Sequence, residues 1–394
     1  QAVVVDEWHE LMGNKRGVQT QLALARLKTF NPALEIWGMS ATLGNLSEAM
    51  HTLLGRADGT LVQGAVPKKL IIDTLLPDVA ARFPWAGHLG LTMLPQVVEE
   101  IALSATTLVF TNTRSQSELW YQAILQARPD WAGQIALHHG SLDRSERDLA
   151  ENGLRDGSLK CVVATSSLDL GVDFSPVDQV IQVGSPKGVA RLLQRAGRSG
   201  HQPGSLSRIV GVPTHALELV EFAAARDAAL ARKVESRTPL RKPLDLLVQH
   251  LVTCAIGTPF EPKAMRREIE SSHAFSEMTD DEWEWALGFI SSGGKALTAY
   301  PRYQKAQIVE GHYTVDDKRL ILQHRLSIGT ISSDPAVSIK FARGKTLGTV
   351  EESFIAGIKT GGHLIFGGRH LTLVRFRDRI ATVKPGAKDT KGRI

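Results

Sequence analysis

The sequence predicts an α/β protein whose sheet-forming part is followed by a helical module and a β-rich end. Up to about residue 240, short β-branched runs alternate with helical patterns, which is typical of parallel sheets covered by helices. Three helical patterns then follow in close succession, and glycine-punctuated β-branched runs fill the end of the chain. With 394 residues and 43% hydrophobic content, the chain is large enough for several cores.

These changes of pattern divide the chain into five segments. We expect residues 1–64 to be the rear part of one α/β domain, 65–97 a linker, 98–235 a complete second α/β domain, 236–300 a winged-helix-like module and 301–394 a truncated β-rich, barrel-like domain. The linker is expected because proline and glycine are frequent between Pro67 and Pro95.

Both α/β segments show a regular order of elements. The first has a strand at Ala2–Val5, a helix marked by Leu22, Leu24 and Leu27, and a strand at Leu34–Met39. The second has helical patterns such as Ser115–Arg128 between five strands. These strands are expected at Thr107–Phe110, Ile135–His138, Cys161–Ala164, Val180–Val183 and Ile209–Val212.

Three short helices characterise the module that follows. Two are expected at Leu244–Ala255 and Lys263–Ser271, and a third begins at Thr279, which can form a capping box with Glu282. The β-rich end then predicts a small antiparallel sheet or barrel.

The third helix carries two tryptophans on different faces. A core stripe at helical spacing consists of Trp283, Ala286, Leu287 and Ile290. Trp285 and Phe289 therefore face elsewhere. Trp285 would either stack on a base of single-stranded nucleic acid or pack against a neighbouring domain, and the spacing leaves both open.

Charge is concentrated at the end of the chain. The net charge is +5, while Arg369–Ile394 holds eight basic residues against Asp378 and Asp389. This basic end favours contact with a polyanion, although a solvated tail would have the same composition.

Cysteine use and hydropathy exclude two classes of protein. Cys161 and Cys254 form no C-x-x-C pair, so no zinc site is implied, and Cys161 is expected to be a buried free thiol. The uncharged stretches reach only about fifteen residues, too few for a membrane span. No membrane partner is expected, and a reduced cytoplasmic setting is the default.

The strongest candidate site is the Asp6–Glu7 pair at the end of the first strand. Such a pair can hold Mg²⁺ through water with Asp6, while Glu7, next to the metal, orients the water that attacks the γ-phosphate of ATP. His9 follows directly and is a further catalytic candidate. Ser40 and Thr42 end the next strand, and together with His9 they are expected to couple nucleotide state to the domain interface.

Two further groups lie in the second α/β domain. Thr165 and Ser166 end a strand and suit phosphate contacts, while Gly171 and Asp173 are expected at the nucleotide, Asp173 on the ribose; an ordinary strand-to-helix turn is the alternative. The catalytic and nucleotide-binding candidates of the later motif are Gln194, Arg195 and Arg198. Arg195 and Arg198 are three residues apart and are expected on one helix face, where they would stabilise developing phosphate charge.

No G-x-x-x-x-G-K-[ST] loop occurs in the sequence. This loop supplies the backbone N–H groups and the lysine that cradle the phosphates. We therefore expect that half of the ATP site upstream of residue 1.

Together these motifs resemble those of superfamily 2 helicases, and further runs narrow the resemblance. The runs are NKRG at 14–17, HHGSL at 138–142, GSPKGVARLLQRAGRSGH at 184–201, LSIGTIS at 326–332 and GTVEESFIAG at 348–357. They resemble the large-helicase-related (Lhr) family, most of all its bacterial ligase-associated DEXH-box members. The resemblance implies an ATP-dependent 3′-to-5′ DNA helicase and translocase in DNA repair, with two RecA-like domains, the first partial here, a winged helix and a barrel-like domain.

The resemblance also implies contacts and partners. Residues expected along the tracking strand are Lys15, Arg16, Thr113, Arg114, His139, Ser141, Thr165 and Ser166. ATP and Mg²⁺ are the expected cofactors. Single-stranded DNA, or a DNA or RNA–DNA duplex, is the expected substrate, with a DNA ligase and a nuclease or phosphoesterase as repair partners.

Two other functions compete with this one. The chain by itself could be a nucleic-acid-binding module without ATPase activity, which the missing phosphate loop favours for the isolated polypeptide. A motor subunit of a restriction or chromatin-type translocase would need partner domains that the sequence does not indicate.

Overall fold

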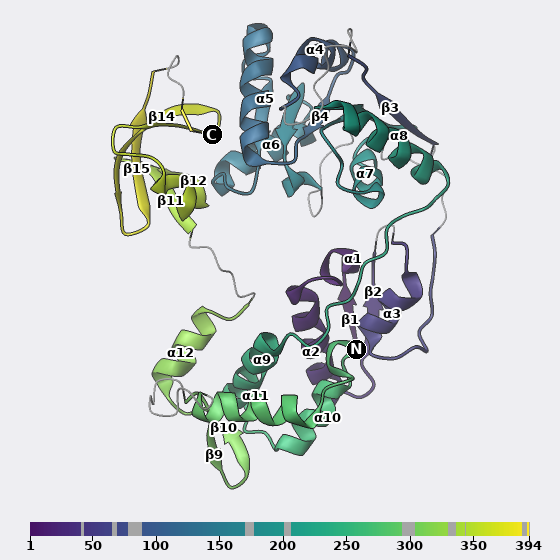
Figure 1. The fold of residues 1–394 in the computed structure, drawn as a ribbon, viewed down its shortest axis with the longest axis vertical. Coiled ribbons are helices and arrows are strands. Elements are labelled where there is room, and N and C mark those ends of the chain that lie inside the picture. Colours follow the sequence, from purple (N-terminus) through teal and green to yellow (C-terminus); the bar gives the residue numbers. More distant parts are fainter. Residues whose placement is uncertain are drawn as a thin grey trace. The chain divides into compact units, whose positions relative to one another are not determined.

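The computed structural model describes residues 1–40, 43–64, 69–77, 89–169, 177–200, 206–293, 304–329, 336–342, 344–387 and 392–393. The chain divides into two compact units, which we call unit 1 and unit 2. Unit 1 comprises residues 1–64 and 235–331, and unit 2 comprises residues 65–234 and 332–394. Each unit thus joins two segments that are far apart in the sequence (Figure 1).

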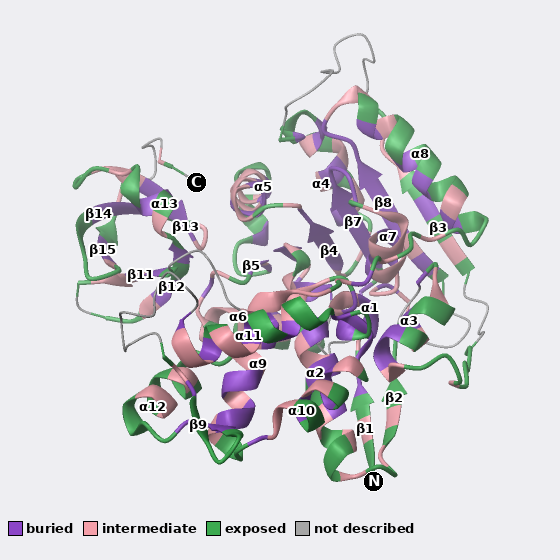
Figure 2. Cartoon of the chain, turned by 60° about the horizontal axis from the view of Figure 1, so that its bottom comes forward, coloured by how far each residue is buried: buried purple, intermediate pink, exposed green. Residues whose placement is uncertain are grey.

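A six-stranded parallel sheet forms the centre of unit 2. Its order is β3 (Lys69–Thr74), β8 (Leu206–Val212), β7 (Gln179–Val183), β4 (Thr107–Phe110), β6 (Cys161–Ala164) and β5 (Ile135–His138). The five strands expected from the sequence are all present. β4, β6 and β7 are buried along their whole length, as Figure 2 shows for β4 and β7, because helices cover both faces of the sheet.

Successive residues of each strand point to opposite faces, so the sheet faces two cores. On one face Val109 packs with α4 (Leu94–Ala102) and α5 (Arg114–Ala127), through residues such as Trp120. On the other face Leu108 and Phe110 pack with residues of three further helices. These are α6 (Arg144–Arg155), α7 (Val189–Ala196) and α8 (Ala216–Leu230).

The segment expected to be a linker, 65–97, contains regular structure. β3 lies inside it and pairs with β8 in parallel, and α4 begins at Leu94. The apolar residues of the run KLIIDT at 69–74 gave the signal for this strand, but the surrounding proline and glycine obscured it.

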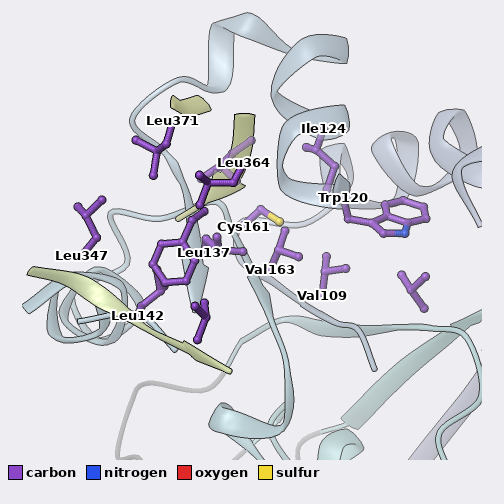
Figure 3. Packing of buried hydrophobic residues seen from close by; sticks show 14 of the residues in the cluster. Val109, Trp120, Ile124, Leu137, Leu142, Cys161, Val163, Leu347, Leu364 and Leu371 are labelled. Carbon is purple, nitrogen blue, oxygen red and sulfur yellow. The ribbon is translucent and has the colours of Figure 1, made fainter. Parts of the chain in front are cut away.

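The β-rich end packs onto the first face of the unit 2 sheet. Its order is β12 (Thr346–Glu351), β11 (Ala336–Phe341), β15 (Ile380–Pro385), β14 (Arg369–Arg377) and β13 (His363–Phe366), with helix α13 (Glu352–Ala356) after β12. The β11–β15 pair is parallel, so the sheet is mixed rather than antiparallel as expected. Figure 3 shows Leu347, Leu364 and Leu371 in one core with Leu137 and Cys161 of the parallel sheet.

Unit 1 begins with two parallel strands, β1 (Ala2–Val5) and β2 (Glu35–Gly38). Both are largely exposed, in contrast to the central strands of unit 2 (Figure 2). The helices that follow them are α1 (Trp8–Leu11), α2 (Lys15–Phe30) and α3 (Leu46–Leu54).

The remainder of unit 1 is helical, with a small hairpin. It consists of α9 (Leu244–Gly257), α10 (Pro262–Glu270), α11 (Asp280–Ser292), the hairpin β9 (Gln307–Val309) and β10 (His312–Thr314), and α12 (Lys318–Leu326). Val18 and Leu22 of α2 share a core with Leu251, Ile269 and Trp283. The first segment and the helical module therefore stabilise each other.

Candidate functional site

The Asp6–Glu7 pair lies in a tight turn between β1 and α1. Asp6 is exposed, and its Oδ1 accepts the Glu7 N–H at 2.8 Å. Glu7 has a left-handed backbone, with φ of 50°, which is uncommon for a residue other than glycine and marks a locally strained position. His9 is buried, and its Nδ1 lies 3.5 Å from Glu7 Oε2.

Hydrogen bonds fix this turn to the end of β2. The Trp8 backbone N–H donates to the Met39 carbonyl at 2.9 Å, and the Met39 N–H donates to the Val5 carbonyl at 2.9 Å. The Trp8 indole N–H donates to the Ala49 carbonyl of α3. Ser40 follows Met39 and is exposed, whereas Thr42 lies outside the described residues. The turn is therefore tied to the segment where the second motif begins.

Lys15 and Arg16 differ in their surroundings at the start of α2. The Lys15 ammonium pairs with the Asp245 carboxylate of α9, so a DNA phosphate would have to compete with this carboxylate. Arg16 is exposed. Of the two, Arg16 fits better the contact expected with a nucleic-acid strand.

In unit 2, three side chains that the sequence analysis did not single out support the Thr165–Ser166 loop. His138 Nδ1 lies 2.7 Å from Ser167 Oγ, and His138 Nε2 lies 3.0 Å from Glu151 Oε1. Burial lowers the pKa of His138, which keeps the ring neutral. The Ser167 hydroxyl also donates to the His138 carbonyl at 3.1 Å, so the ring and the backbone of His138 both hold this loop. Only spatial proximity, which the sequence does not give, links these residues.

The Thr165–Ser166 loop itself remains accessible. Ser166 is exposed and Thr165 is half-buried. Gly171 and Asp173, further along the same motif, lie outside the described residues.

The two arginines of the later motif do not share a helix face, which corrects the expectation. Helix α7 ends at Ala196, because the chain turns at Gly197, so Arg198 lies beyond it. Arg195 is 1% exposed and binds both oxygens of Asp169, at 2.8 and 3.1 Å. It also donates to Gln182 and lies 4.4 Å from the Phe110 ring.

Burial distinguishes Arg195 from the other residues of the motif. Its guanidinium is enclosed by Asp169, Gln182 and Phe110, and burial lowers its pKa. Arg198 is half-buried and donates to the Asp169 carbonyl at 2.6 Å. Gln194 is half-buried as well. Arg198 and Gln194 are therefore the candidates for direct nucleotide contact.

Other residues expected along the DNA strand lie instead where the β-rich end meets the parallel sheet. His139 is 1% exposed, 3.3 Å from Glu118 and edge-on to Phe366. Glu118 in turn accepts the backbone N–H groups of Gly367 and Gly368. Burial excludes the His139 side chain from contact with a strand in this arrangement.

Arg114, Thr113 and Ser141 serve the same junction or its neighbouring helix. Arg114 stacks on the Phe354 ring at 4.3 Å, and burial lowers its pKa. The Thr113 hydroxyl caps α5 by accepting the Gln116 N–H. The Ser141 carbonyl accepts the Thr349 N–H at 2.8 Å. Thr113 is nevertheless exposed and Ser141 half-buried, and the Ser141 contact involves its backbone alone, so both hydroxyls stay candidates for the strand.

Trp285 lines a groove on the helical part of unit 1. Trp283 is 5% exposed and Trp285 is 47% exposed, which confirms the two faces expected of α11. Trp285 and Phe289 stack with their ring centroids 5.1 Å apart. The groove has a volume of about 440 Å³ and is completed by α9 and α12, with Asp245 and Lys305 at its wall. Most of the exposed lining is apolar, and Asp245 and Lys305 add polar groups, so the groove suits an aromatic base.

Two family models match this chain, and the longer match covers parts of both units. Residues 227–393 match the winged helix domain of large helicase-related protein, and residues 91–202 match the helicase conserved C-terminal domain. Unit 2 thus contains the RecA-like fold of a helicase C-terminal domain. In the part of the chain that the structure describes, no helix is long and apolar enough to cross a membrane.

Curated relatives align along nearly the whole chain. ATP-dependent helicase Lhr-Core of Methanothermobacter thermautotrophicus is 32% identical over 98% of this chain and 46% of its own length. Lhr-Core protein 2 of Thermococcus barophilus is 30% identical, with the same coverages. The chain thus spans about half the length of these relatives.

Solved structures agree with this fold. Mycobacterium smegmatis helicase Lhr bound to ssDNA and AMP-PNP has a TM-score of 0.74 and 29% identity, over 85% of this chain and 44% of that one. The DUF1998 helicase MrfA bound to DNA has a TM-score of 0.73 over 98% of this chain and 50% of that one, and at 19% identity it supports the fold alone.

Proposed function

Since this chain belongs to the large-helicase-related (Lhr) family, we propose that it forms the C-terminal part of the motor core of an ATP-dependent DNA helicase. The observation that carries the proposal is the Asp6–Glu7 turn, with an exposed carboxylate at a strand end followed by a strained glutamate. Strand ends of parallel sheets are where nucleotide sites of this chemistry are built.

The two carboxylates have different proposed roles. Asp6 holds Mg²⁺ through water. Its carboxylate is exposed, and carboxylate oxygens are the ligands that this hard cation prefers. The ion would neutralise phosphate charge. Glu7 orients the attacking water, and the buried His9 beside it holds the Glu7 side chain in place. Ser40 and Thr42 are proposed to couple this turn to the domain interface.

In unit 2 the proposed nucleotide contacts are Gln194 and Arg198, with Gly171 and Asp173 from the preceding motif. Arg198 supplies positive charge to the phosphate in the transition state. Arg195 acts on Asp169, since their bidentate pair fixes the segment whose carbonyl accepts from Arg198. Arg195 is therefore a positioning residue in this proposal.

The proposed contacts to DNA use the side chains that remain accessible. These are Arg16, Thr113, Ser141, Thr165, Ser166 and Trp285. Hydroxyls and an arginine would contact phosphates, whereas Trp285 and the groove beside it would take a base by stacking.

The finer parts of the proposal rest on the family resemblance. They are 3′-to-5′ movement on single-stranded DNA, unwinding of a DNA or RNA–DNA duplex, a role in DNA repair, a cytoplasmic location, and a ligase and a nuclease or phosphoesterase as partners. A partial first RecA-like domain ahead of the complete second one is likewise proposed from the resemblance. For the isolated chain, a DNA-binding module without ATPase activity is the second candidate, because the sequence contains no phosphate loop.

Two proteins test this function: the 394-residue chain and a longer version that carries the family's phosphate loop. We expect the chain alone to hydrolyse ATP no faster than buffer, and the longer protein to show DNA-stimulated turnover. Glu7→Gln in the longer protein should reduce turnover about 10²-fold or more, because a transition-state group is lost.

Glu35→Gln provides the control, since Glu35 is an exposed carboxylate on β2 and should leave turnover unchanged. Equal turnover of the Glu7→Gln and parent proteins would exclude the proposed role of Glu7. DNA-stimulated ATPase activity in the purified chain alone would exclude the second candidate, a DNA-binding module without ATPase activity.

A further inference from the structure

Three side chains with metal-binding atoms meet between α9 and α10 of unit 1. His250, Cys254 and Glu268 each offer one ligand atom, and these atoms all lie within 4.8 Å of one another. His250 and Cys254 are four residues apart on α9, hence on one helix face. Cys254 Sγ lies 3.4 Å from His250 Nε2.

Glu268 contributes an unpaired buried oxygen to this cluster. The side chain of Glu268 is 4% exposed, and its Oε2 accepts from Arg26 Nη1 at 3.0 Å. Among the described residues, Glu268 Oε1 has no hydrogen-bond partner. Buried carboxylate oxygens are rarely left unsatisfied, and a bound ion or water commonly satisfies them. His250 is only half-buried, so the cluster is close to solvent.

We propose that His250, Cys254 and Glu268 bind one transition-metal cation of the Zn²⁺ class, a site distinct from the ATP site. Imidazole nitrogen, thiolate sulfur and carboxylate oxygen are the three ligand types of zinc, and three protein ligands leave one position for water. The thiolate disfavours Mg²⁺ and Ca²⁺, which take oxygen ligands.

Charge and proton balance are consistent with this assignment. Zn²⁺, one thiolate and the Glu268 carboxylate sum to zero, and the Cys254 proton is released to solvent on binding. Arg26, bound to the other oxygen, orients the carboxylate as an outer partner while opposing the cation with its charge.

The C-x-x-C spacing that usually reveals zinc is absent because the cluster contains one cysteine, and its third ligand, Glu268, comes from another helix. His250-x-x-x-Cys254 alone would not distinguish a metal site from a buried helix face. The structure shows that Glu268 lies beside this pair, which gives the cluster its third ligand atom.

Cobalt(II) titration of the metal-stripped 394-residue chain tests the site. Co²⁺ should bind at one equivalent, with visible d–d bands and a near-ultraviolet thiolate-to-cobalt charge-transfer band, and Zn²⁺ should displace it whereas excess Mg²⁺ should not. Cys254→Ser should remove the charge-transfer band. His250→Gln and Glu268→Gln should each weaken Co²⁺ binding by about tenfold or more.

Cys161→Ser is the matched control, because Cys161 is fully buried in unit 2 and should leave the band intact. Zn²⁺ should also raise the melting temperature of the parent chain and not that of Cys254→Ser. Absence of the charge-transfer band in the folded parent chain, or its persistence in Cys254→Ser, would overturn the proposal. Failure of the ATPase test would leave this assignment untouched, since cobalt binding needs no nucleotide.

Discussion

The two arginines of one motif differ in their exposure and therefore in their expected effect when replaced. Arg195→Met removes the bidentate partner of the buried Asp169 carboxylate and leaves Arg191 at 3.7 Å as its remaining cation, so the loss should reach at most about 3–5 kcal/mol. Arg198→Met removes a hydrogen bond to the Asp169 carbonyl, worth about 1 kcal/mol. In the longer protein, Arg198→Met should lower turnover about 10²-fold. Thermal melts measure the loss of stability in each variant, and ATPase assays measure the loss of turnover.

A stable Arg195→Met protein that has lost only turnover would show that Arg195 contacts the nucleotide directly. In that case both arginines would stabilise phosphate charge, as the sequence predicts, and the Arg195–Asp169 pair would have to separate when ATP binds.

His273 should make the stability of unit 1 depend on pH. Burial lowers the pKa of His273 to about 4, with Arg241 and His51 adding to the shift while Glu48 and Glu277 oppose it. Its pKa in the unfolded chain is about 6.5. Below that pH the unfolded chain takes up a proton that the folded chain does not, so stability falls by at most about 3 kcal/mol by pH 4, and by less if solvent screens the neighbouring charges.

Urea unfolding at pH 7, 5.5 and 4 measures this dependence. His273→Gln cannot titrate and should reduce the loss between pH 7 and 4. An identical loss in His273→Gln and the parent chain would assign the pH dependence to other groups.

At the scale of elements, helix α11 places two tryptophans in opposite environments. Trp283→Ala should destabilise unit 1 by about 3–5 kcal/mol, because a large ring leaves a packed core. Trp285→Ala should leave the melting temperature nearly unchanged and weaken single-stranded DNA binding by about 1–3 kcal/mol. The salt dependence should not change, because no charge is removed.

Fluorescence titrations and melts on both variants measure these effects. If Trp285→Ala lowers the melting temperature and keeps the affinity for DNA, the ring packs against protein and the groove is not a base site.

The elements that local pattern predicts well are those whose burial is uniform. β4, β6 and β7 are continuous apolar runs because both faces of their sheet are covered, and the capping box at Thr279 gives the start of α11 directly. The end of α7 was missed because the Arg-x-x-Arg spacing suits a helix, whereas the chain turns at Gly197. The site residues that pair only in space, such as Glu151 with His138, leave no sequence signal.

At the scale of the whole molecule, sequence order and spatial grouping differ. Five consecutive segments were expected, yet the contacts join 1–64 with 235–331 and 65–234 with 332–394. The reason is physical: Val18 and Leu22 find their core partners in α9 to α11, more than two hundred residues along the chain. Periodicity shows that a helix has an apolar face, but not which element covers it.

Two units with separate cores should unfold separately, since cooperativity is a property of a shared core. Trp283→Ala should lower only the transition of unit 1, and Arg195→Met only that of unit 2. Calorimetry, with hydrogen exchange to assign each transition, measures this. Because each unit contains segments distant in sequence, exchange in 1–64 should follow that in 235–331 rather than that in its neighbour 89–169. A single transition shifted equally by both substitutions would show that the two cores unfold as one, and the division into units would then be wrong for the energetics of this chain.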